Sequence, residues 1–187
     1  MALIMLTRLR EIVEKVAAAT SLTDALEVLV DETCQAMDTE VCSIYLADND
    51  RQCYYLMATR GLKKPRGRVV TLAFDEGIVG LVGRLAEPIN LADAPSHPSF
   101  KYVPKVKEER YRAFLGVPMI YRRQLLGVLA VQQRESRQFN ETEESFFGNI
   151  GDSVSRDPFS DSAQRFVWQA ATEQDPCDRS LSRNCRG

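Results

Sequence analysis

The residues with the most versatile chemistry in this chain are its cysteines and its histidine. The cysteine count is odd, and no two cysteines have the C-x-x-C spacing of zinc ligands or redox pairs. The sequence therefore predicts no disulfide framework, no metal site and no cofactor. Because there is a single histidine, a phosphorelay that requires two histidines in this chain is excluded. These residues are Cys34, Cys42, Cys53, Cys177, Cys185 and His97.

Two segments concentrate positive charge, one on either side of residues 70–100. The first surrounds Pro65 and is either an anion site or docking patch for a partner domain, or a solvated loop. In the second, Arg112 enters a predicted strand, where its planar guanidinium suits a carboxylate. The basic residues are Arg60, Lys63, Lys64, Arg66 and Arg68 in the first segment, and Lys101, Lys105, Lys107, Arg110 and Arg112 in the second.

Composition indicates one globular domain that binds neither nucleic acid nor membrane. The chain has 187 residues, of which 44% are hydrophobic and 27% charged, and its formal net charge of −2 does not favour a nucleic-acid partner. No apolar run approaches the ~18 residues that span a bilayer. The apolar residues 1–6 lack the basic lead-in of a signal peptide. We therefore expect a cytoplasmic protein.

Apolar spacing predicts an α+β fold. A first helix covers 6–19, and a second begins at Ser21, which forms a capping-box-like start with Asp24. A short helix over 77–86 contains three glycines, which are costly in a helix and imply a close approach of backbones. A last helix is capped by Asn140, with Glu143 at the capping-box position. Strands are predicted at 41–46, 53–58, 69–74, 88–91, 113–121 and 125–132. This order suggests a six-stranded antiparallel sheet flanked by N- and C-terminal helices.

Composition changes abruptly after Phe147. From Gly148 to Gly187, seven of forty residues are large and apolar, without helical or strand periodicity. We therefore divide the chain into a domain at 1–147 and a disordered or frame-shifted tail at 148–187. With this boundary the last helix has about two turns, a length at which isolated helices are marginal.

An ordered set of motifs between residues 74 and 131 resembles a GAF domain. The motifs are FDEGIVG at 74–80, PINLAD at 88–93, HPSF at 97–100, FLGVP at 114–118 and LGVLAV at 126–131. YYLMATRGL at 54–62, together with 77–91, is similar to the N-terminal domain of enzyme I of the nitrogen phosphotransferase system. The resemblance implies a bacterial sensor domain for nitrogen regulation, whose proposed effectors are glutamine and alpha-ketoglutarate. The phosphohistidine motif and the phosphoenolpyruvate-binding barrel of that family have no counterpart in this chain.

The resemblance also implies where a ligand would bind, because GAF pockets lie between the sheet and the short helices over it. Gly77 would lie at the border of the pocket, and apolar walls would come from Phe74, Ile78, Phe100, Tyr102 and Phe114. Polar contacts would come from Asn90, Asp93, His97, Lys101 and Arg112. A purely structural interpretation stays open, in which the aromatic residues belong to the core and Asp93 caps a turn.

Other GAF chemistries fit this sequence less well. Cyclic-nucleotide and bilin domains carry residues that are missing here, and a haem site would depend on His97 alone. A GAF-fold reductase of free methionine sulfoxide would need reactive thiols, for which Cys42 and Cys53 are candidates by strand position. The predicted hairpin that they flank would bring the two thiols near each other.

We therefore predict a small-molecule-sensing regulatory domain of a phosphoenolpyruvate-protein phosphotransferase, without catalytic activity of its own. The competing interpretation is an interaction module with a filled pocket, which forms a homodimer through its terminal helices.

Overall fold

The computed structural model describes residues 2–63, 70–101, 111–156 and 165. Within these ranges the chain forms four α-helices, six strands and one turn of 3-10 helix. In chain order they are α1 (Ala2–Ala17), α2 (Leu22–Ala36), β1 (Val41–Asp48), β2 (Cys53–Arg60), β3 (Thr71–Ala73), α3 (Gly77–Leu85), β4 (Ile89–Leu91), η1 (Ala94–Ser96), β5 (Ala113–Tyr121), β6 (Gln124–Gln133) and α4 (Glu141–Val154).

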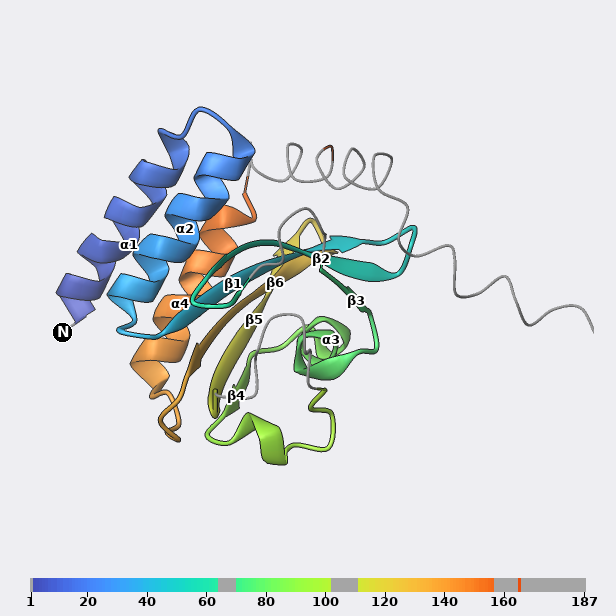
Figure 1. The fold of residues 1–187 in the computed structure, drawn as a ribbon. Coiled ribbons are helices and arrows are strands. Elements are labelled where there is room, and N and C mark those ends of the chain that lie inside the picture. The colour runs from blue at the N-terminus through green and yellow to red at the C-terminus, as the bar shows by residue number, and fades with distance from the viewer. Residues whose placement is uncertain (1, 64–69, 102–110, 157–164, 166–187) are drawn as a thin grey trace, which may run out of the picture.

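The strands form one antiparallel sheet in the order β3-β2-β1-β6-β5-β4. Helices α1, α2 and α4 cover one face, and α3 lies over the other (Figure 1). The predicted α+β class and six-stranded antiparallel sheet are confirmed. Because both faces are covered, β1 and β6 have apolar side chains on both sides.

Alternate residues of each strand enter two separate cores. The helix-face core, under α1, α2 and α4, contains Cys42, Ile44 and Leu46 from β1 and Leu115 and Val117 from β5. The cleft-face core, under α3, contains the intervening residues of the same strands and the apolar face of α3. Its members include Val41, Tyr45, Tyr54, Val82, Phe114 and Val128. This alternation follows from the two-residue period of a strand.

Helix starts follow the predicted caps. The Ser21 hydroxyl accepts a hydrogen bond from the Asp24 N–H at 3.1 Å. Asn140 and Glu143 form a complete capping box, in which the Asn140 side chain accepts from the Glu143 N–H at 3.0 Å and the Glu143 carboxylate accepts from the Asn140 N–H at 2.8 Å. Both predicted helix starts are confirmed.

The predicted two-turn length of the last helix is wrong. Helix α4 has 14 residues and runs to Val154, and Phe147, Ile150 and Val154 are buried against the sheet and its neighbouring helices. These apolar residues keep helical spacing, but Gly148, Gly151 and the polar residues between them hide the pattern. Residues 148–154 therefore belong to the folded domain. Most of the predicted tail lies outside the described residues, and its frame-shifted origin stays a prediction.

The predicted close approach at the glycines of α3 is confirmed. A Cβ atom on Gly80 would lie 2.6 Å from the Phe74 carbonyl oxygen, and one on Gly83 would collide with the Tyr54 hydroxyl. Gly77 begins α3 with φ +69°, a conformation that favours glycine. These glycines bring α3 down onto β2 and onto the turn that follows β3.

Candidate functional site

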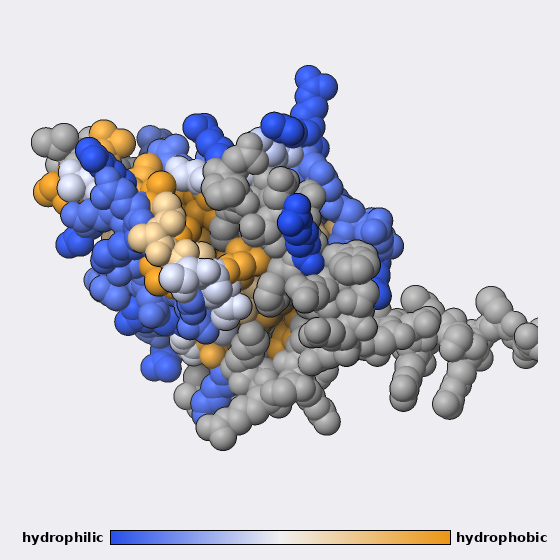
Figure 2. Space-filling view, turned by 90° about the horizontal axis from the view of Figure 1, so that it is seen from above, coloured by the Kyte–Doolittle hydropathy of each residue, from blue (hydrophilic) through white to orange (hydrophobic). Residues whose placement is uncertain are grey.

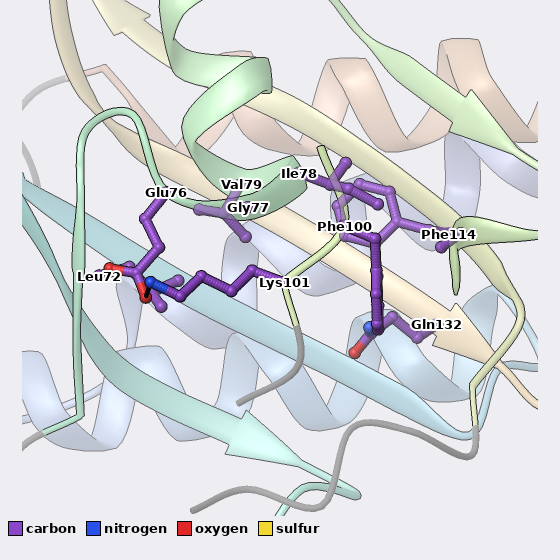
Figure 3. Close-up of a pocket in the computed structure, with 10 residues that line it drawn as sticks. Leu72, Glu76, Gly77, Ile78, Val79, Phe100, Lys101, Phe114 and Gln132 are labelled. Atoms are coloured by element: carbon purple, nitrogen blue, oxygen red, sulfur yellow. Dashed lines mark ion pairs between the residues drawn. The ribbon is translucent and has the colours of Figure 1, made fainter. Parts of the chain in front are cut away.

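A cleft on the face of the sheet covered by α3 is the candidate site (Figure 3). Three parts of the chain form it: the start of α3, the sheet beneath, and residues 94–101, which we call the cleft segment. Its volume is about 20 Å³, which holds about one water molecule. The lining residues are Leu72, Glu76, Gly77, Ile78, Val79, Ala94, Phe100, Lys101, Phe114 and Gln132.

The floor and walls of the cleft are apolar, with one buried amide. Ile78 and Phe114 are 6% and 2% exposed, and the partly buried Phe100 packs against the same core. Gln132 on β6 is 3% exposed and places its amide at the end of the cleft near Phe100 (Figure 3). An apolar pocket with few polar groups is typical of small-molecule sites.

An ion pair crosses the rim of the cleft. The Lys101 ammonium lies 2.9 Å from the Glu76 carboxylate, so the cleft segment is joined to the start of α3. Glu76 also accepts a hydrogen bond from the Ala73 N–H at 3.0 Å. Burial acts to raise the pKa of Glu76, but the Ala73 hydrogen bond and the Lys101 ammonium outweigh it, and the pKa is lowered. The Glu76 carboxylate is therefore charged at neutral pH.

The structure brings five of the predicted pocket residues to the cleft: Gly77, Ile78, Phe100, Lys101 and Phe114. Phe74 does not line it, because its ring packs on Tyr54 with 4.6 Å between centroids. Tyr102 lies outside the described residues, as do Lys64, Arg66, Arg68, Lys105, Lys107 and Arg110.

The remaining predicted polar residues bind other parts of the chain. Asn90 bonds to Phe139 and Glu144, on the far side of β4 from the cleft. The Arg112 guanidinium donates to both carboxylate oxygens of Asp93, at 3.1 and 3.3 Å, and this lowers the pKa of Asp93. The carboxylate predicted for Arg112 is thus supplied by the chain itself. His97 Nδ1 accepts a hydrogen bond from the Ser99 N–H within its own loop.

Sequence reasoning missed five lining residues: Leu72, Glu76, Val79, Ala94 and Gln132. Two of them had a detectable signal. Gln132 is two residues beyond Ala130 and four beyond Val128, so it falls on the same face of β6. Glu76 immediately precedes the glycine that begins α3.

The cysteines of the described ranges form no disulfide with one another and are buried in the helix-face core, on the opposite face of the sheet from the cleft. Cys42 and Cys53 belong to the helix-face core, and Cys53 pairs with Asp48, six positions along β1 from Cys42. This separation is about 20 Å, so the prediction that the hairpin brings the two thiols together is wrong. Burial, followed by the neighbouring Cys34 thiol, raises the pKa of Cys42 well above its usual value. Neither thiol has the environment of a reactive cysteine.

The described ranges contain neither a cluster of metal ligands nor a membrane-spanning helix. No three histidine, cysteine, aspartate or glutamate side chains there are grouped closely enough to hold a metal ion. None of the helices in those ranges is long and apolar enough to cross a bilayer.

Comparison with known proteins identifies the fold family. The family model described as GAF domain matches residues 21–157. This chain belongs to the GAF family. The GAF domain from a phosphoenolpyruvate-protein phosphotransferase (ptsP) of Coxiella burnetii has 41% identity and a TM-score of 0.76, covering 92% of this chain and 98% of that one.

A protein of Escherichia coli (strain K12) described as phosphoenolpyruvate-dependent phosphotransferase system is 81% identical over 142 residues. The match covers 76% of this chain and 19% of that protein, so the chain spans about a fifth of its relative. The predicted similarity to the GAF domain of these phosphotransferases is confirmed. A free methionine-R-sulfoxide reductase from Neisseria meningitidis shares the fold, with a TM-score of 0.73, but has 19% identity and covers 89% of this chain and 93% of that one.

Proposed function

We propose that this GAF domain is the cytoplasmic, non-catalytic sensor of a phosphoenolpyruvate-protein phosphotransferase. The observation that carries the proposal is the 81% identity to the E. coli protein over 142 residues. At this identity the lining of the cleft and the surrounding core are expected to be shared. The effector is glutamine or alpha-ketoglutarate, and its binding favours one arrangement of the domain and so biases phosphotransfer in the larger protein.

The cleft must widen before either metabolite enters, because about 20 Å³ accommodates one water molecule. The groups that block it most directly belong to the cleft segment. Phe100 is partly buried, and Lys101, whose side chain is 61% exposed, is tied by its ion pair with Glu76. Displacing this segment costs an exposed ion pair, worth up to ~1 kcal/mol, and the contacts of Phe100. A ligand that replaces those contacts with its own can hold the segment open.

Ligand-induced thermal stabilisation tests the proposal, since binding to the native state alone raises the midpoint of unfolding. Glutamine, alpha-ketoglutarate and cyclic nucleotides are the panel, with affinity measured by calorimetry. Phe100→Ala should weaken binding at least about tenfold, because it removes an aromatic wall of the cleft. Phe74→Ala is the matched control, since Phe74 belongs to the same core without lining the cleft. A panel that stabilises neither the natural chain nor the control contradicts a sensor for these ligands.

An interaction module that dimerises through its terminal helices is the second candidate, and exposed apolar residues on α1 favour it. Ile4, Leu6 and Val13 are 66%, 59% and 37% exposed. Figure 2 shows apolar surface among polar residues on the side of the molecule that carries α1. Leu6→Glu should convert a dimer to a monomer in light scattering after gel filtration, whereas Leu85→Glu on α3 should not. A monomeric natural chain contradicts this candidate.

A further inference from the structure

Asn90 joins the strand that leads into the cleft segment to the start of α4. Its Nδ2 donates to the Phe139 carbonyl at 2.7 Å and to the Glu144 carboxylate at 3.0 Å. Its Oδ1 accepts from the Phe139 N–H at 3.1 Å. Because an N–H can only donate and a carbonyl can only accept, the orientation of this amide is determined by its partners.

The connection has a second bond beside it. Two residues after Asn90, the Ala92 carbonyl accepts a hydrogen bond from the Ser136 hydroxyl at 2.9 Å. The Asn90 amide and the Ala92 carbonyl therefore both link residues 90–92 to the start of α4 and the segment that leads into it. Two residues further along, Ala94 begins the cleft segment and is 1% exposed in the cleft wall. The cleft lining at Ala94 therefore lies only two and four positions along the chain from Ala92 and Asn90, which hold the start of α4.

On its other side, Asn90 contacts the capped start of α4. Glu144 belongs to the first turn of α4, next to the capping box of Asn140 and Glu143. Arg137 reinforces that turn with an ion pair of 3.0 Å to Glu143, whose side chain is 15% exposed. From this turn, α4 packs along β5 and against α1. A small displacement of the turn would therefore be carried along a whole helix.

We propose that Asn90 transmits rearrangements of the cleft segment to the N-terminal turn of α4. The inference rests on the proposed function, in that the cleft is where the domain senses its ligand. Asn90 acts as a positioning residue: it holds α4 in one register relative to β4 while the cleft is closed. Movement of the cleft segment shifts β4 and Ala92, and the three bonds of Asn90 impose that shift on Phe139 and Glu144.

The alternative is that Asn90 is an anchor with no part in coupling. An anchor stabilises the start of α4 by the same amount whatever the state of the cleft. A transmitting residue makes α4 respond to a perturbation of the cleft, and that response disappears with the residue. A double-mutant cycle separates these roles, because it measures whether two distant changes are independent.

The perturbation is Lys101→Ala, which removes the rim ion pair from an exposed position of the cleft segment. The readout is amide hydrogen exchange of residues 144–148 in α4, measured by NMR on the full chain without added ligand. Lys101→Ala is made in three backgrounds: the natural sequence, Asn90→Ala and Asn140→Ala. The last is the matched control, since it weakens the cap of α4 by the same substitution but leaves the bonds of Asn90 in place.

We expect Lys101→Ala to speed exchange in α4 at least about twofold in the natural and Asn140→Ala backgrounds, and not in the Asn90→Ala background. Asn90→Ala alone should speed exchange at Phe139 about fivefold, the value of one net hydrogen bond. Equal responses in all three backgrounds would overturn the proposal, and so would an unresponsive α4 in the natural chain. No effector is used, so this result is independent of whether glutamine or alpha-ketoglutarate binds.

Discussion

The two faces of the sheet are built from the same strands but have different capacities for function. The helix-face core is covered by three helices of 14 to 16 residues, and its members include three buried thiols. Among the described residues, the cleft-face core is covered by the nine-residue α3, a single 3-10 turn and the cleft segment, which leave a cleft with a buried amide and an ion pair at its rim. The helix-face core is therefore the main source of stability, and the other face carries the cleft that we propose as the ligand site.

The largest expected difference between the faces is in side-chain truncation. Phe147→Ala should destabilise the fold by about 4 kcal/mol, because the Phe147 side chain on α4 is fully buried in the helix-face core and its loss leaves a closed cavity. Phe114→Ala, beside the existing cleft, should cost about 1 kcal/mol less, since solvent can reach the new space. Urea unfolding of both variants measures the difference, and equal losses would contradict a more open cleft face.

Thiol reactivity tests the closed nature of the helix face. Iodoacetamide labelling of Cys42 at pH 8 should be at least about 100-fold slower in the native chain than in urea, because burial raises the pKa of its thiol and excludes the reagent. Mass spectrometry of the peptide that contains Cys42 isolates this residue from the other four cysteines. Rapid native labelling would reopen the thiol-reductase interpretation.

Glycine substitution should have opposite effects on α3 and α4. Gly80→Ala should destabilise by about 2 kcal/mol, because its Cβ would lie 2.6 Å from a backbone carbonyl that cannot move freely. Gly148→Ala should stabilise by about 0.5 to 1 kcal/mol, because its Cβ meets nothing within 4 Å and alanine favours a helix. Thermal unfolding of the two variants compares them. Unchanged stability of Gly80→Ala would show that α3 does not need its close approach to the Phe74 carbonyl.

The smallest expected effect is the pH dependence of the cleft rim. The pKa of Glu76 is lowered in the folded state. Its contribution to the free energy of unfolding is therefore present above the ordinary carboxylate pKa and is lost as the pH falls through the pKa of the folded state. Glu76→Gln should therefore cost about 0.5 kcal/mol of stability at pH 7 and less at pH 3. Stability curves of the variant and the natural chain at both pH values provide the test. A cost that is independent of pH would assign the effect to packing.

Local patterns predicted most of the elements, and tertiary contacts account for the errors. The strands and both capped helix starts follow from alternation and capping residues. Helix α4 was predicted too short because Gly148 and Gly151 reduce its apolar density, while packing on β5 stabilises it. Length in such a helix depends on its neighbours more than on its own sequence.

The candidate site was harder to predict because it depends on which way each side chain points. Ile89 and Leu91 pack on the cleft face, so Asn90, which lies between them, points toward α4. The same alternation directs Gln132 into the cleft. Asp93 and Arg112 form an ion pair with each other, and no pattern within either segment of the sequence reveals this pairing.

The order of the strands also sets the order of events when the domain is made. Strand β1 lies at the centre of the sheet, and its partner β6 is synthesised some 80 residues later. Until residues 124–133 leave the ribosome, the apolar β1 has one unpaired edge, which is a site for aggregation. The domain therefore folds late in its own synthesis, and fragments that end before β6 should depend on chaperones to remain soluble.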